Sequence, residues 1–283
     1  MGTTTDAGQL YVVAVPIGNL EDITLRALRI LEEVDLILCE DTRTTGKLLE
    51  LLGLPKRPML SLHDHNELAR TEKVLQKLKS GLTLALVSDA GTPVISDPGE
   101  RLIASLIQND VSVSPIPGPC ALITALCSAG LPSGSFTFLG FPPTKPGALA
   151  RHLNGYAKSP HTLVFYVGPH HLDKFLTQAV TCFGEARRVV VGRELTKKFE
   201  EFIRGTLGEV RELLTTVRGE VVVLIEGQLE SEAPSEEQIV MELELLLAQG
   251  VKPTAAAKSV AKSLGCSRDE VYKIGLRLKA GTH

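Results

Sequence analysis

The sequence predicts an α/β protein with two α/β domains on mostly parallel sheets, followed by a small C-terminal helical module. Short β-branched runs alternate with longer segments of helical period over the first 225 residues. Such alternation indicates crossovers that join parallel strands through helices. Breaks in composition near residues 130 and 234 divide the chain into residues 1–130, 131–233 and 234–283.

Each strand is expected where β-branched or aromatic residues cluster, and each helix where apolar residues recur at helical spacing. The apolar run at 221–225 is typical of a strand covered on both faces. Strands are expected at residues 10–15, 35–39, 83–87, 111–116, 137–139, 162–167, 188–191 and 220–225. Helices are expected at residues 25–33, 44–52, 67–79, 100–108, 121–127 and 171–180.

The C-terminal tail is expected to form three helices, at residues 238–249, 254–264 and 268–279. The segments 235–238 and 267–270 both match the capping box that begins a helix, and Gly250 and Gly265 stand where helices should end. The last two helices resemble a helix-turn-helix. Basic residues outnumber acidic ones after residue 250, which is typical either of an RNA-binding face or of a packed helix pair with a solvated basic side.

Bulk composition excludes several classes of protein. The net charge of −3 means that any RNA binding would depend on a local patch. Five isolated cysteines without a C-x-x-C pair argue against a disulfide framework and against a zinc site, and favour a reducing compartment. No secretory signal and no apolar stretch long enough for a membrane span is visible, so a soluble cytoplasmic protein is expected. A plastid origin stays open, because a transit peptide is removed from the mature chain.

Three loops rich in Gly, Pro and Asp directly follow predicted strands, at residues 16–22, 88–99 and 115–121. Ligands of open α/β sheets bind beyond the carboxyl ends of the strands. Glycines in these loops allow a close backbone approach, and the helix after residue 120 offers free N–H groups to a carboxylate. Any one loop alone is better explained as an ordinary strand-to-helix turn, but three on one sheet edge favour a ligand site.

The absence of several well-known motifs argues against some classes of ligand. The sequence contains no G-x-G-x-x-G after a strand, no P-loop, no G-x-S-x-G elbow and no H-E-x-x-H motif. A nicotinamide cofactor, a nucleoside triphosphate and a metal are therefore not expected.

Two polar stretches, residues 39–43 and 63–67, are denser in reactive groups than turns require. They offer a general base, an acid and a phosphate contact. Solvated loops with helix-capping duties explain them about as well. Residues 193–198 carry a weaker signal, because charged residues often follow an edge strand.

Six of these motifs together resemble a known family. They are PIGNLEDITLR at 16–26, EDTR at 40–43, HDHNE at 63–67, SDAGTP at 88–93, PGP at 117–119 and RELTK at 193–197. In this order the chain resembles, over nearly its whole length, the 16S rRNA (cytidine-2′-O)-methyltransferase family of the tetrapyrrole-methylase superfamily. EDTR and HDHNE make the resemblance specific, because relatives that act on porphyrinoid precursors or on diphthine lack them.

The resemblance implies an enzyme that binds S-adenosylmethionine (AdoMet) in the cleft between two α/β domains, usually as a homodimer. The implied substrate is a cytidine in the decoding region of small-subunit rRNA, free or in the assembled 30S subunit, with the helical tail as an RNA-associated appendage. The positions implied to line the cofactor are Pro16, Asp89, Thr92, Ile95, Cys120, Ala121 and Tyr166, with Ile225 and Glu226 closing the far side.

One motif departs from the family. Tyr166-Val-Gly-Pro-His-His171 stands where the family often has Tyr-Glu-x-Pro-His-Arg, so both the acid and the arginine are absent. Losing both members of an ion pair leaves no buried charge unpaired. The departure puts a catalytic role for this stretch in doubt.

Methyl transfer to a ribose oxygen requires an in-line approach of oxygen and methyl at about 3–3.5 Å and a base that takes the hydroxyl proton. Asp41 and His63 are the candidate bases, and Arg43 and Lys197 the candidate contacts to RNA phosphate. Two rivals remain: a porphyrinoid methyltransferase of the same fold, which would not need the basic tail, and a non-catalytic nucleic-acid-binding protein, which would leave the three ligand loops unexplained.

Overall fold

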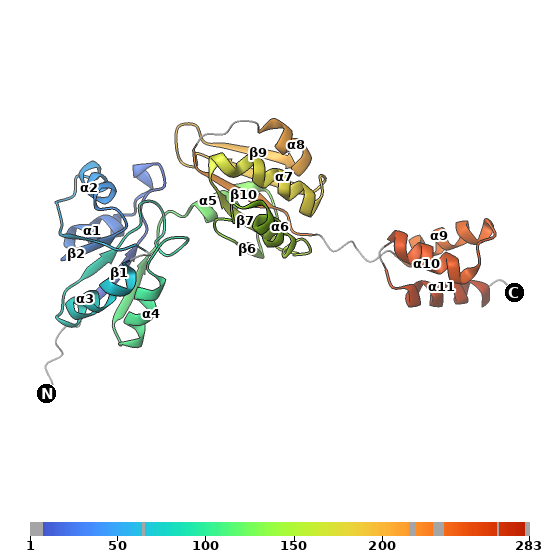
Figure 1. The fold of residues 1–283 in the computed structure, drawn as a ribbon, viewed down its shortest axis with the longest axis horizontal. Helices are drawn as coiled ribbons and strands as arrows, with labels where there is room; N and C mark the ends of the chain where they lie inside the picture. Colours follow the sequence, from blue (N-terminus) through green and yellow to red (C-terminus); the bar gives the residue numbers. More distant parts are fainter. Residues whose placement is uncertain (1–7, 64–65, 215–218, 229–234, 265, 281–283) are drawn as a thin grey trace. The chain divides into compact units, whose positions relative to one another are not determined.

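The computed structural model describes residues 8–63, 66–214, 219–228, 235–264 and 266–280. The chain divides into two compact units, Met1–Gly227 and Gln228–His283. The first unit holds both sheets, and the second holds the C-terminal helices (Figure 1). The two sheets lie on either side of residue 130, while a division of the first unit into separate domains there stays a prediction.

The first sheet has five parallel strands in the order β3-β2-β4-β1-β5. Its strands alternate their side chains between two apolar layers, as Ile37 faces one layer and Leu36 and Leu38 the other. Helices α1 and α2 pack on the first layer, and α3 and α4 on the second (Figure 1). The elements are β1 Gln9–Val13, α1 Leu25–Glu33, β2 Leu36–Cys39, α2 Thr42–Leu51, β3 Met59–Ser61, α3 Glu67–Lys79, β4 Leu84–Leu86, α4 Glu100–Gln108 and β5 Ser112–Ile116.

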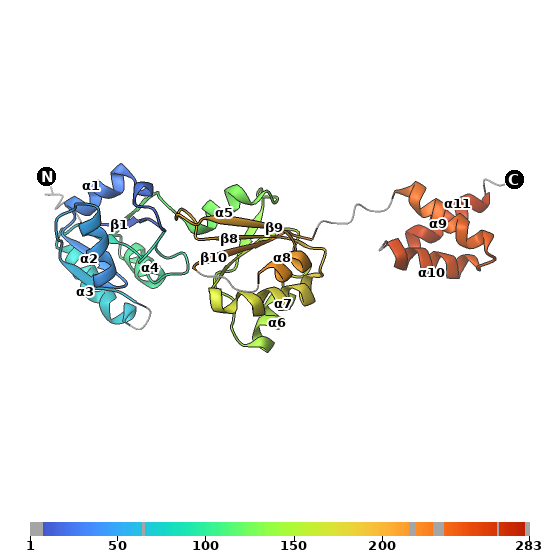
Figure 2. The same cartoon turned by 90° about the horizontal axis from the view of Figure 1, so that it is seen from above.

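The second sheet also has five strands, in the order β6-β7-β10-β8-β9. Helix α5 covers one face, and α6, α7 and α8 cover the other (Figure 2). The elements are α5 Ala121–Ala129, β6 Phe136–Phe138, α6 Pro146–Asn154, β7 Thr162–Val167, α7 Leu172–Phe183, β8 Arg188–Arg193, β9 Glu201–Thr206, α8 Leu207–Leu213 and β10 Val221–Ile225. Short 3₁₀ turns lie at Leu20–Asp22 and Pro169–His171.

The prediction of mostly parallel sheets holds for the first sheet and is wrong for the second. Only β6 and β7 pair parallel, whereas β10 runs antiparallel to both β7 and β8, and β8 runs antiparallel to β9. The physical reason is the short connection between β8 and β9, which contains no crossover helix and so forms a hairpin. Strand β9 was not predicted, because Glu201 and Arg204 interrupt its apolar pattern.

The second unit is a bundle of three helices, α9 Glu236–Ala248, α10 Pro253–Leu264 and α11 Arg268–Ala280. It has its own core, in which Ile239 and Leu243 of α9 pack against Val260 and Ile274. The capping box predicted at Ser235 and Gln238 is present. Gly250 takes a φ of +80° after α9, while the second predicted helix stop, Gly265, lies outside the described residues.

Two expected absences can be examined over the described residues. None of their helices is long and apolar enough to cross a membrane. The same part of the chain contains no group of three or more His, Cys, Asp or Glu side chains arranged to hold a metal ion.

Candidate active site

A pocket of about 290 Å³ lies in the first unit, where loops from both sheets meet. The carboxyl ends of β1, β4, β6 and β7 point into it, together with the start of α5 and the start of β10. Its wall is mainly apolar, with three carboxylates on it. The lining residues are Ile17, Asp89, Ala90, Gly91, Thr92, Ile95, Ser96, Asp97, Cys120, Ala121, Phe141, Tyr166, Val167, Gly168, Pro169, Leu195, Glu220, Val221 and Val222.

The three predicted ligand loops are joined by hydrogen bonds at this pocket. Val15 and Gly91 exchange backbone hydrogen bonds of 2.8 and 3.0 Å, which tie the first loop to the second. The Thr92 hydroxyl donates to the carbonyl of Pro119 at 2.9 Å, which ties the second loop to the third. The prediction that these loops share one sheet edge is confirmed.

The loop after β4 is locally strained. Val94 and Ser96 adopt φ values of +75° and +69°, a left-handed conformation that is uncommon for any residue other than glycine and rarest for a β-branched one. Backbone strain of this kind persists only where the surrounding structure holds it, and it concentrates at functional sites. Ile95, between the two strained residues, lines the pocket.

Tyr166 connects the pocket wall to the start of α5. Its phenolic oxygen accepts a hydrogen bond of 3.0 Å from the backbone N–H of Leu122. Its ring makes edge-to-face contacts with Phe138 and Phe141, at centroid distances of 4.9 and 5.6 Å. Burial is the main cause that raises the pKa of the Tyr166 hydroxyl, so the group stays neutral.

The chemical groups of the pocket fit AdoMet. The cap residue of α5, Cys120, makes no side-chain hydrogen bond to the helix, so amides at this N-terminus are available for a carboxylate. The carboxylates of Asp89 and Asp97 match the positive charges of an amino group and a sulfonium. The apolar wall around Ile95 and Phe141 suits an adenine ring.

Six of the nine predicted cofactor positions line the pocket: Asp89, Thr92, Ile95, Cys120, Ala121 and Tyr166. Pro16 does not, although the next residue, Ile17, does.

Ile225 and Glu226, expected to close the far side of the cofactor, do not line this pocket. Strand β10 runs antiparallel to β7, and Ile225 pairs with Leu163 at the far end of that strand. Four residues of strand, about 13 Å, separate Ile225 from Val221, which does line the pocket. The start of β10 and not its end therefore contributes to the site.

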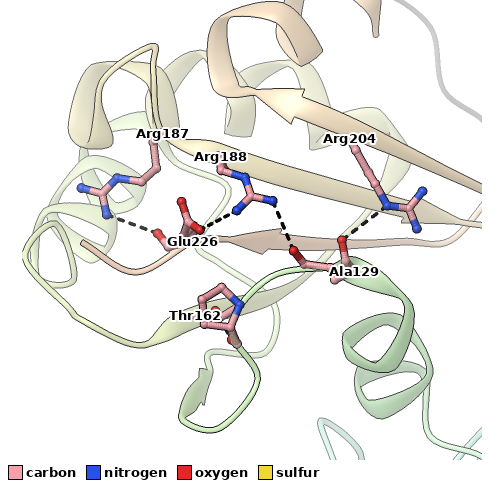
Figure 3. A network of polar contacts seen from close by, with 8 residues as sticks. Ala129, Thr162, Arg187, Arg188, Arg204 and Glu226 are labelled. Atoms are coloured by element: carbon pink, nitrogen blue, oxygen red, sulfur yellow. Dashed lines mark hydrogen bonds and ion pairs between the residues drawn. The ribbon is translucent and has the colours of Figure 1, made fainter. Parts of the chain in front are cut away.

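Glu226 instead belongs to a network that anchors the end of α5 (Figure 3). Its carboxylate pairs with Arg188 at 3.0 Å, and Arg188 also donates to the carbonyl of Gly130. Arg204 donates to the carbonyls of Ser128 and Ala129. These guanidinium groups satisfy carbonyls that a helix end leaves without partners.

Asp41 and Arg43 form one motif at the start of α2. Asp41 is the cap residue, accepts from the backbone N–H of Arg43 at 2.8 Å and binds its guanidinium at 2.7 Å. These hydrogen bonds, the side-chain one first, lower the pKa of Asp41 to about 2. A carboxylate held in this way is a weak proton acceptor near neutral pH. The backbone N–H of Asp41 donates to Asp89 at 3.2 Å, so the motif borders the pocket wall.

His63 does not line the pocket, and it is hydrogen-bonded to Asn66. The amide oxygen of Asn66 accepts from the backbone N–H of His63 at 3.0 Å, and its amide nitrogen lies 2.8 Å from Nε2 of the ring. Glu67, the last residue of the HDHNE motif, is buried and accepts from the backbone N–H of Leu102 in α4 at 2.9 Å. Asp64 and His65 lie outside the described residues.

Lys197 makes two ion pairs at the pocket, with Glu194 at 3.0 Å and with Glu220 at 3.4 Å. Burial lowers the pKa of Lys197, but the hydrogen bonds and charges of the two glutamates outweigh it and leave the pKa raised. The ammonium therefore stays charged and already has carboxylate partners, which argues against phosphate binding as its main role.

Sequence reasoning missed Glu220, Phe141 and Leu195. Glu220 and Phe141 belong to no motif, and Leu195 lies in the RELTK motif, in which only Lys197 was given a role. Only the antiparallel course of β10 brings Glu220 to the pocket. The departure at 166–171 places Val167, Gly168 and Pro169 on the pocket wall, where they offer backbone and apolar surface instead of a charge.

Comparison with known proteins identifies the family to which this fold belongs. A model of the Tetrapyrrole (Corrin/Porphyrin) Methylases matches residues 9–211. The chain belongs to this family. A "Ribosomal RNA small subunit methyltransferase I" from Synechocystis sp. is 44% identical to this tetrapyrrole methylase, over 96% of this chain and 99% of the relative. A protein of the same name from Escherichia coli O157:H7 is 44% identical over 95% of each chain.

Solved structures share the fold at low identity. Uroporphyrin-III C-methyl transferase from Thermus thermophilus, complexed with S-adenyl homocysteine, is 21% identical with a TM-score of 0.53, over 78% of this chain and 98% of that one. Diphthine synthase is 13% identical with a TM-score of 0.59, over 77% and 90%. The predicted family, the predicted α/β fold and the assignment as an AdoMet-dependent methyltransferase are confirmed.

Proposed function

We propose that this tetrapyrrole methylase transfers a methyl group from AdoMet to the ribose 2′-hydroxyl of a cytidine in the decoding region of 16S rRNA. The observation that carries the proposal is the 41–44% identity, over at least 94% of the chain, to proteins named ribosomal RNA small subunit methyltransferase I. Identity over this length includes the helical unit, whereas the family model ends at residue 211.

The first unit supplies the cofactor site in this proposal. Bound AdoMet supplies a methyl group that the sulfonium already activates, so the protein needs neither a covalent intermediate nor a metal-bound nucleophile. Asp89, Asp97 and the start of α5 hold the charged groups, and Tyr166 keeps the start of α5 in place through the N–H of Leu122. The protein's main contribution is to hold the ribose oxygen in line with the methyl group.

The polar motifs beside the pocket supply the RNA contacts. The side chain of Arg43 is 89% exposed, so it can reach a phosphate, and Asp41 fixes its direction. His63, positioned by Asn66, is a second candidate for contact with the nucleotide. The basic residues of α10 and α11 would bind RNA backbone away from the reacting ribose. The enzyme is proposed to act as a homodimer in the cytoplasm.

The test is transfer of a labelled methyl group from AdoMet to 30S subunits that lack ribose methylation, with naked 16S rRNA in parallel. Nuclease mapping of the label should place it on a cytidine ribose in the decoding region. Label on a base, or transfer to a porphyrinoid but to neither RNA substrate, would overturn the proposal. The ratio of rates on the two RNA substrates identifies the form of RNA that is methylated.

A further inference from the structure

A charged cluster of Glu194, Lys197 and Glu220 lies at the edge of the pocket. Lys197 Nζ is 3.0 Å from Glu194 Oε1 and 3.4 Å from Glu220 Oε2. Lys197 and Glu194 are largely buried, with 32% and 22% of their side chains exposed, whereas 77% of the Glu220 side chain is exposed. Glu220 is thus the member of the cluster that both lines the pocket and is exposed to solvent.

The backbone around the cluster is held in an unfavourable conformation. Glu194 and Thr196 adopt φ values of +49° and +65°, so the loop after β8 repeats the alternating left-handed pattern of the loop after β4. Such strain is unfavourable, persists only where the surrounding structure holds it, and concentrates at functional sites. Leu195, between the two strained residues, lines the pocket.

Two glycines allow the cluster to pack. A Cβ on Gly219 would overlap the carboxylate of Glu194. A Cβ on Gly18 would lie 2.5 Å from Cγ of Lys197, so the loop after β1 closes on the cluster from the first sheet. Segments from both halves of the unit therefore fix the position of the cluster. A solvent-exposed ion pair on an edge strand would not need this close packing.

Two other carboxylates near the pocket, those of Asp41 and Asp89, are less suited to take a proton. Asp41 is bound by the side chain and the backbone of Arg43. Asp89 accepts from the backbone N–H of Asp41 and lies at the end of β4, among the groups assigned to the cofactor. Glu220 has one partner at 3.4 Å, and its second oxygen makes no hydrogen bond or ion pair recorded within the described residues.

We propose that the carboxylate of Glu220 accepts the proton of the ribose 2′-hydroxyl and that Lys197 is the positioning residue that holds this carboxylate at the pocket. The inference rests on the proposed function, because it requires a hydroxyl nucleophile. As the oxygen gains its bond to the methyl carbon, the O–H bond breaks and its proton passes to Glu220. The electron pair of the broken carbon–sulfur bond stays on sulfur, and Glu220 then loses the proton to water.

The test compares Glu220→Gln with the full-length wild-type protein in single-turnover methyl transfer to 30S subunits between pH 6 and 9. Glu212→Gln, an exposed residue of α8, is the matched control and should behave as wild type. AdoMet binding by calorimetry and 30S binding by filter retention are measured for each variant.

We expect Glu220→Gln to lower the transfer rate about 10²–10⁴-fold, the typical contribution of a general base, with both dissociation constants within about threefold of the wild-type values. The residual rate should rise with hydroxide concentration, because solvent must then take the proton.

Lys197 variants test the positioning role. Lys197→Met should lower the transfer rate by about tenfold, and Lys197→Arg should restore most of the rate, because a cation again holds Glu220. A Glu220→Gln enzyme with the wild-type rate and pH profile would overturn the inference, as would a rate loss that weaker binding explains entirely. Mapping of the wild-type product separates the two proposals: label away from ribose overturns both, whereas ribose label with an unaffected variant overturns only this one.

Discussion

The Tyr166 hydroxyl connects strand β7 to the first turn of α5. Its oxygen accepts the N–H of Leu122 in the first turn of α5, where unpaired amides are expected to receive a carboxylate. Tyr166→Phe should destabilise the protein by about 1 kcal/mol, the net value of one hydrogen bond, and should weaken AdoMet binding several-fold. Denaturant unfolding and calorimetry measure the two effects. Tyr156→Phe, outside the pocket, is the control, and equal effects from both variants would contradict this role for Tyr166.

The Asp41 carboxylate makes a pH-dependent contribution to the start of α2. Its pKa is lowered to about 2 by hydrogen bonds from the side chain and backbone of Arg43. A folded-state pKa below the unfolded value of about 3.9 means that the contribution is complete above pH 4 and is lost as the pH falls through 2. Asp41→Asn should therefore unfold at a lower temperature than wild type near pH 7, and the difference should shrink between pH 4 and 2. A difference independent of pH would show that the charge of Asp41 does not contribute.

At the scale of elements, the sequence predicted the helices of the first sheet better than the pairing of the second. Helices α1, α3 and α4 begin and end at the predicted residues, because their apolar faces recur at helical spacing and Thr24 caps the first of them. Antiparallel pairing in the second sheet could not be predicted, since a hydrophobic run such as Val221–Ile225 does not reveal its direction. Because the direction of β10 was not predicted, Glu226 was expected at the pocket and Glu220 was not.

Glu67 ties the HDHNE motif to the pocket through helix α4. The carboxylate accepts the N–H of Leu102, so it caps a helix whose own cap residue, Gly99, has no side chain. The strained pocket loop leads directly into Gly99. Glu67 therefore connects the HDHNE motif to the loop that lines the pocket.

Glu67→Ala should lower the free energy of unfolding by about 1–3 kcal/mol, because it leaves a buried N–H unpaired. It should also weaken AdoMet binding. Glu67→Gln keeps the acceptor oxygen and should be nearly neutral. Glu72→Ala, on the exposed face of the same helix, controls for loss of side chain. Thermal unfolding and AdoMet titration of the three variants measure both effects. If Glu67→Ala lowers stability but leaves AdoMet affinity unchanged, the carboxylate supports only the fold.

At the scale of the whole molecule, the sequence predicted the family and the cofactor but only part of the site. Three loops at the ends of strands are recognisable in the sequence by their Gly, Pro and Asp residues. They contain Asp89, Thr92 and Cys120, which line the pocket. Side chains that reach the pocket through tertiary packing, such as Phe141, carry no local signal. The candidate base was assigned from motif density, which cannot show that Asp41 is already bound by Arg43.

The two compact units predict a division of labour between cofactor and RNA. The pocket is built entirely from residues of Met1–Gly227, and the helical unit has its own core. A chain ending at Gly227 should therefore fold and bind AdoMet within about threefold of the full-length protein. Its 30S affinity should fall at least tenfold and depend less steeply on salt, because each lost phosphate contact reduces the slope of log K against log salt by about one.

Lys258→Gln combined with Lys262→Gln should reproduce part of this loss, whereas Lys73→Gln with Lys77→Gln on α3 should not. Filter binding between 50 and 200 mM salt measures all four proteins. Equal 30S affinity for the truncated and full-length chains would mean that the basic surface of the helical unit is only a solvated face.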